Sequence, residues 1–187
     1  MSNGGMILGS LAILGDDTSG IARPLLEAAV ANAAVNCVNA TSKDGTWVET
    51  ANYWYCVFCL LLSRIYNSFG SVGTTGHAEA TSALMTATGG GDFGMLNNNP
   101  SYNLTSIYHI YATGMTSLFN YGDHGPNKFS STANSLLFYG NVYKAPVYTL
   151  FQRDRFDAAE PWSMFWYDPT YVRATSVLEV GILKYPV

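Results

Sequence analysis

The chain has 187 residues, of which 48% are hydrophobic and 12% are charged, and its formal net charge is −4. This length suffices for one domain with its own core, and the hydrophobic content excludes a disordered chain. The negative net charge excludes bulk electrostatic capture of nucleic acid. Soluble proteins usually carry roughly twice this share of charged residues, so we expect the chain to bury most of its surface.

Short apolar or small-residue stretches alternate with loops rich in Gly, Asn and Asp, which predicts an all-α chain of short helices. The aromatic segment Pro161–Pro169 ends at a turn, and Tyr171–Val187 alternates weakly, as a strand would. Helix, loop and helix recur at the spacing that stacked helical hairpins give. The expected helices, in chain order, are Met6–Leu14, Pro24–Asn36, one that begins at Trp47, one that includes Thr81–Thr88, Asn103–Phe119, Ser130–Tyr139 and Ala145–Phe151.

The most apolar run in the chain is Cys56–Leu62, within the unbroken apolar stretch Trp54–Leu62. A membrane-spanning helix needs about 20 such residues, so we expect no membrane span. Cys56 and Cys59 match a C-x-x-C pattern, but a zinc site needs further ligands at metal spacing and a redox pair needs a helix N-terminus. We therefore expect buried thiols with no metal and no cofactor.

The segment from Asp44 to Tyr55 leads from a polar turn into a helix that carries a carboxylate, an amide and several aromatic rings. Aromatic rings with polar groups between them suit a carbohydrate cleft, because a sugar has an apolar face and a polar rim. An aromatic-rich core helix explains the same composition equally well. The candidate substrate-binding residues are Glu49, Asn52, Trp54 and Tyr55 in this segment and His124 in a later loop.

Four segments in order, spread over most of residues 3–168, resemble the heparinase II/III-like proteins, which are polysaccharide lyases related to alginate lyases. The segments are Asn3–Met6, Asp44–Tyr55, Tyr121–Phe129 and Glu160–Pro169. The resemblance implies a partial α/α toroid of helical hairpins, which in the family precedes a β-sandwich domain. It also implies β-elimination at a uronic acid, in which a base removes the proton α to the carboxylate and an acid protonates the leaving oxygen.

The resemblance implies that Tyr53 is catalytic, with Tyr55 as its nearest rival. A phenol with an ordinary pKa of about 10 needs a supporting environment to act as a base. The family's upstream neutralising residue and its β-sandwich histidine have no counterpart here. We therefore expect an inactive fragment that lacks the β-sandwich, drawn from a secreted or cell-surface relative that acts on an acidic polysaccharide.

The family-like sequence continues from Asn52–Tyr55 directly to Gly73–Glu79, and the 17 residues Cys56–Val72 interrupt it. Our hypothesis is that these residues are a non-native insertion, either a translated intron or an error in the gene model. Joining the two sides would place His77 seven positions after Tyr53, about two helical turns, and so on the same face. His77 is therefore the second predicted catalytic residue. We therefore expect one partial toroid domain at residues 1–169, interrupted by the insertion at residues 56–72. A divergent tail follows at residues 170–187.

Two other functions remain open from the residues alone. A glycoside hydrolase on an α/α barrel needs two carboxylates that face one cleft, and Glu49 and Glu79 are the pair to consider. A non-catalytic helical protein that binds carbohydrate or has a structural role needs neither the Tyr53–His77 pair nor the Glu49–Glu79 pair. His109 lies between aromatic residues on an expected amphipathic helix, which is typical of a core histidine, whereas Arg153 could meet a sugar carboxylate or lie on a solvated surface.

Overall fold

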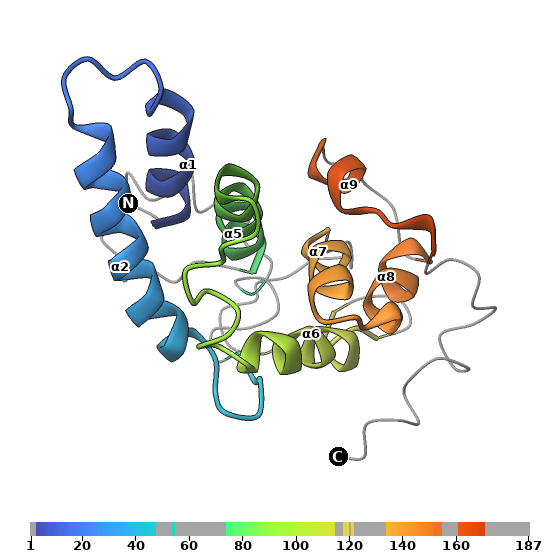
Figure 1. Ribbon diagram of the computed structural model, residues 1–187. Coiled ribbons are helices and arrows are strands. Elements are labelled where there is room, and N and C mark those ends of the chain that lie inside the picture. The colour runs from blue at the N-terminus through green and yellow to red at the C-terminus, as the bar shows by residue number, and fades with distance from the viewer. Residues whose placement is uncertain are drawn as a thin grey trace.

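The computed structural model describes residues 3–47, 54, 74–114, 118–119, 121, 134–154 and 161–170. These residues form an assembly of helices with no β-strand, so the predicted all-α class is confirmed for them (Figure 1). Among these residues, Thr113 and Leu118 form an isolated antiparallel β-bridge. The helices are α1 Asn3–Ile13, α2 Ala22–Ala40, α5 Thr74–Thr88, α6 Ser101–Tyr111, α7 Ser135–Val142, α8 Pro146–Arg153 and α9 Pro161–Trp166.

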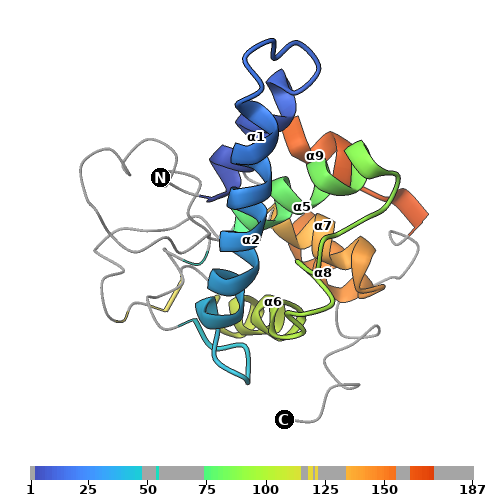
Figure 2. The ribbon, with the colours of Figure 1, turned by 60° about the vertical axis from the view of Figure 1, so that its left-hand side comes forward.

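The first two helices form a hairpin that packs beside α5 (Figures 1 and 2). Asn3 at the start of α1 donates from Nδ2 to Oδ1 of Asn32 in the second half of α2, at 2.9 Å. Gly4 permits the close approach of α5, because a Cβ at this position would lie 3.0 Å from the carbonyl oxygen of Gly76. Small residues in α1 and α5 thus set how closely these helices pack.

Asp17 fixes the start of α2. Its Oδ2 accepts a hydrogen bond from the backbone N–H of Ala22 at 2.6 Å, and its Oδ1 accepts from the backbone and hydroxyl of Ser19. The Ser19 hydroxyl and then the Ala22 N–H hold the pKa of the Asp17 carboxyl below its usual value. The carboxylate therefore satisfies one of the donors that the first turn of α2 leaves open.

The structure changes the predicted boundary of α6, because this helix ends at Tyr111 and not at Phe119. After Ala112 the chain folds back, and the N–H of Phe119 donates to the carbonyl of Ala112 at 2.8 Å. Gly114, which has low helix propensity, follows this end. The prediction of a helix here is therefore confirmed, but the helix ends at Tyr111, before the predicted end at Phe119.

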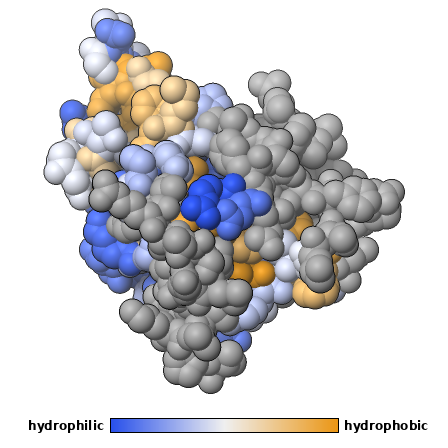
Figure 3. Space-filling model, turned by 90° about the vertical axis from the view of Figure 1, so that its right-hand side faces the viewer, coloured by the Kyte–Doolittle hydropathy of each residue, from blue (hydrophilic) through white to orange (hydrophobic). Residues whose placement is uncertain are grey.

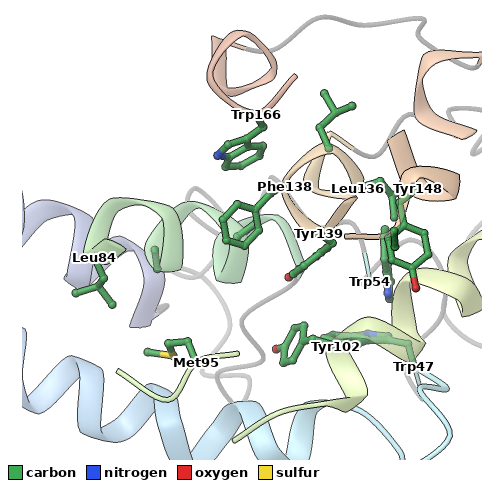
Figure 4. Packing of buried hydrophobic residues seen from close by; sticks show 14 of the residues in the cluster. Trp47, Trp54, Leu84, Met95, Tyr102, Leu136, Phe138, Tyr139, Tyr148 and Trp166 are labelled. Carbon is green, nitrogen blue, oxygen red and sulfur yellow. The ribbon is translucent and has the colours of Figure 1, made fainter. Parts of the chain in front are cut away.

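The core includes side chains from every described helix, and its largest side chains are aromatic (Figure 4). Helix α7 is buried around its whole circumference, since Leu136, Leu137, Phe138 and Tyr139 are all between 0% and 4% exposed. A helix that is apolar on every side is expected to be buried. Gly140 lets α8 cross α7 closely, because a Cβ there would lie 2.4 Å from the Thr149 Oγ1.

Helix α9 is attached to this core by Trp166. The Trp166 ring lies 5.6 Å from that of Phe138, and its Nε1 donates to the hydroxyl of Ser82 in α5 at 3.0 Å. Its outer face exposes Met164 and Phe165. Figure 3 views the molecule from the side on which α9 lies in Figure 1, and apolar residues reach the surface there among hydrophilic ones. Of the helices that the structure describes, none combines the length and the hydropathy needed to cross a bilayer.

Candidate functional site

His77 is a buried member of a polar cluster at the first turns of α5. It is 1% exposed. Its Nδ1 lies 2.8 Å from Oη of Tyr139 in α7, its Nε2 lies 3.0 Å from the carbonyl oxygen of Met95, and its ring stacks on Tyr102 of α6 at 3.8 Å between centroids. Figure 4 shows Tyr102, Tyr139 and Met95 converging on one region of the core. Three separate segments therefore position this one imidazole.

The tautomer of His77 follows from its partners. A carbonyl oxygen can only accept a hydrogen bond, so Nε2 carries a hydrogen and donates it to Met95. In the neutral ring, Nδ1 then presents its lone pair to the hydroxyl of Tyr139. That hydroxyl also lies 3.0 Å from the carbonyl oxygen of Thr74. When His77 is neutral, the single hydroxyl hydrogen of Tyr139 serves either Nδ1 or the Thr74 carbonyl. When His77 is protonated, Nδ1–H can donate to Tyr139 while the tyrosine donates to Thr74.

Burial lowers the pKa of His77 to about 4, against the opposing effects of the Met95 carbonyl and the Asp92 carboxylate. His77 is therefore neutral at pH 7, and its Nδ1 is available as a proton acceptor. Burial and then the same Asp92 carboxylate raise the pKa of Tyr143, which stacks on Tyr139 at 5.9 Å. Asp92 thus acts on the cluster at a distance, as the anion near its edge.

The loop between α5 and α6 holds the Met95 carbonyl in place. Burial by itself would raise the pKa of the Asp92 carboxyl. The backbone hydrogen bonds that it accepts from Leu96, Gly94 and Asn97 outweigh this effect and hold the pKa below its usual value. Asn99 donates from Nδ2 to the carbonyl oxygens of Met95 and Gly94. Gly94 has φ +79°, and a Cβ there would lie 2.4 Å from the Asn98 side chain, so a glycine is required.

Trp54, predicted to bind substrate, is fully buried at 0% exposure. Its ring stacks on His109 at 4.1 Å, and its Nε1 donates to the hydroxyl of Thr105 at 2.9 Å. The stacking surface that a sugar would use is thus occupied by His109. A sugar could reach the indole only after a change in core packing. His109 itself is 1% exposed, so its prediction as a core histidine is confirmed.

Glu79 is half-buried on α5 and has a partner within the chain. Arg153 pairs with the neighbouring Asp154 at 2.7 Å at the end of α8, which is a partly exposed ion pair. The other predicted positions lie outside the described residues, namely Glu49, Asn52, Tyr53, Tyr55, Cys56, Cys59, His124, the segment Cys56–Val72 and the tail Tyr171–Val187. The structure therefore brings His77 and Trp54 into one core and tests no pairing of Tyr53.

Sequence reasoning missed Tyr139 and Tyr102, the two phenols around His77. The available indication was the all-round apolar character of Ser135–Val142, which predicts burial. A buried tyrosine hydroxyl needs a hydrogen-bond partner. Tyr139 in such a helix therefore implied a polar partner from elsewhere in the chain, although the sequence does not identify that partner as His77.

No protein-family model, curated protein or solved structure matches this chain. The likeness to heparinase II/III-like proteins therefore stands as a hypothesis that rests on the four quoted segments. Within the part of the chain that the structure describes, no group of three or more His, Cys, Asp or Glu side chains could hold a metal ion. The chemistry available to the described cluster is that of an imidazole, two phenols and backbone carbonyls.

Proposed function

We propose that this chain belongs to the helical toroid of a polysaccharide lyase and takes part in β-elimination on a uronic-acid-containing polysaccharide. The observation that carries the proposal is the hydrogen bond between His77 and Tyr139. Elimination requires a group that removes a carbon-bound proton and a group that protonates the leaving oxygen. A phenol beside a neutral imidazole can provide such a proton relay, and the predicted Tyr53 would be the group that faces the sugar.

Binding provides the first test, since we expect little turnover from this chain by itself. Addition of a short oligouronate should shift the NMR resonances of aromatic residues near His77, whereas a neutral oligosaccharide of the same length should not. The net charge of −4 offers the polyanion no general attraction, so selective binding would require a built site. Equal response to both sugars, or to neither, would contradict the acidic-polysaccharide proposal.

Product analysis separates the lyase from the hydrolase alternative. A lyase product absorbs in the near ultraviolet through its new double bond, whereas a hydrolase releases reducing ends without that absorbance. Tyr139→Phe should lower any lyase rate by removing the hydroxyl at His77. The matched control is Tyr148→Phe, which removes another buried hydroxyl, one bonded to Asn103. An equal loss in both variants would indicate a structural effect and count against the relay.

A non-catalytic helical protein is the second candidate, and a specific observation favours it. His77, Tyr139 and Trp54 are all buried, and each makes hydrogen bonds within the protein. Core polar clusters of this kind stabilise a fold without any catalytic role. This candidate predicts neither near-ultraviolet product nor new reducing ends, together with a stability loss in Tyr139→Phe.

A further inference from the structure

The N-terminal end of α5 is buried, although the first turn of a helix usually meets solvent or a capping side chain. Thr74 and Thr75 are 0% and 1% exposed. The first backbone N–H groups of a helix have no partner within that helix, and leaving them buried without partners is costly. The buried backbone N–H groups at this end of α5 therefore need acceptors from residues that precede them in space.

Trp54 contacts this end of α5. Its own backbone is helical, and its carbonyl oxygen accepts a hydrogen bond from Thr74 Oγ1 at 2.7 Å, although 20 positions separate the two residues. Within a continuous helix, a threonine hydroxyl makes this bond to the carbonyl three or four residues earlier. Removing the 17 residues Cys56–Val72 would turn the separation of 20 into three.

The contacts made with α6 agree with this register. Trp54 stacks on His109 and His77 stacks on Tyr102. Tyr102 and His109 are seven positions apart on α6, which is about 10 Å of helix. With residues Cys56–Val72 removed, Trp54 and His77 would be six positions apart, or about 9 Å of helix. The two ring pairs therefore have comparable spacings on both helices.

We infer that Trp54 and α5 are two parts of one helix, and that a chain in which Tyr55 is joined directly to Gly73 folds to the same core. The inference depends on backbone register and on contacts between described residues. Its consequence for catalysis rests on the proposed function, because the joined sequence would set Tyr53 seven positions before His77. Measurements of folding therefore test the helical continuity, and measurements of function test the proposed function separately.

The direct test is deletion of residues 56–72 from the full chain. The shortened protein should keep its helical circular dichroism per residue and melt several degrees higher, because a shorter connection between Trp54 and Thr74 costs less conformational entropy to close. The register control is deletion of residues 56–70, which leaves Thr74 five positions after Trp54 and rotates the two sides out of alignment. This control should melt lower than the first variant.

A failure of the 56–72 deletion to fold, or equal melting of both deletions, would overturn the inference. A second measurement uses the intact chain. Helical continuity predicts nuclear Overhauser contacts from the Trp54 Hα to the amide and β protons of Thr74, as between residues three apart in a helix. Absence of those contacts would also overturn it. If the shortened chain folds as expected but its aromatic resonances do not respond selectively to an oligouronate, the proposed function fails while this inference stands.

Discussion

At the scale of single residues, the central feature is a histidine that the fold keeps neutral. His77 is enclosed by the Tyr102 ring, the Tyr139 hydroxyl and the Met95 carbonyl, with Asp92 as the nearby anion. The sequence identified His77 as a candidate through its distance from Tyr53. It could not identify the partners of His77, because they come from α6, α7 and a loop far along the chain.

The neutral state of His77 predicts how stability depends on pH. The unfolded chain takes up a proton near the ordinary value of 6.5, whereas the folded chain does so only near a pKa of about 4. The unfolded state therefore binds more protons between these values, so stability should be full above pH 6.5 and fall as the pH drops towards 4. The complete loss corresponds to about 3 kcal/mol.

Denaturant midpoints measured from pH 7 to pH 4.5 check this prediction, with His77→Gln as the control. Glutamine retains a donor and an acceptor but does not titrate, so the variant should lose less stability over the same range. His109 and His124 remain in both proteins, and their effects cancel in the comparison. Parallel curves for the two proteins would show that His77 is not the group responsible.

At the scale of helices, the sequence predicted which segments are helical better than it predicted where each helix begins and ends. The expected helices Met6–Leu14, Pro24–Asn36 and Ala145–Phe151 lie close to α1, α2 and α8. In the structure, Asp17 and Pro146 mark where α2 and α8 start. The end of α6 was misplaced, since the fold-back of Phe119 onto Ala112 depends on a tertiary arrangement that propensity does not contain. Helix packing also depends on particular glycines.

Two glycine-to-alanine substitutions should have opposite effects on stability. In α7, Gly140→Ala places a Cβ 2.4 Å from the Thr149 Oγ1, so overpacking should cost about 1–3 kcal/mol despite better helix propensity. In α1, the exposed Gly9 has no neighbour within 4 Å of a Cβ, so Gly9→Ala should stabilise the protein by up to about 1 kcal/mol. Urea denaturation of both variants measures the difference, and the same sign in both would contradict the packing described.

At the scale of the whole molecule, aromatic side chains join helices that are distant in sequence. Trp166 connects α9 to α5 and α7, Trp54 connects to α6, and the His77 cluster connects α5, α6 and α7. Buried aromatic side chains such as Tyr139, Tyr148 and Trp54 thus provide both apolar area and polar ends for hydrogen bonds inside the protein. The low charge content is consistent with a molecule organised in this way.

The attachment of α9 predicts a contrast between neighbouring residues. Trp166→Ala should cost about 3–5 kcal/mol, because it removes a buried indole together with its bond to Ser82. Phe165, the preceding residue of the same helix, is 78% exposed, so Phe165→Ser should change stability by less than about 0.5 kcal/mol. Thermal melts of both variants test this, and a large loss from Phe165→Ser would show that its outer face is covered.

The sequence by itself determined the helical class, the approximate positions of most of the described helices and the burial of His109, because these follow from local periodicity and composition. It also marked His77 and raised the hypothesis of an interruption at Cys56–Val72. Only the tertiary structure decided which groups surround His77, that Trp54 faces His109 in the core, and that the Trp54 carbonyl meets Thr74. Those contacts join residues 18 to 62 positions apart, and no local pattern encodes which distant surfaces will bury each other.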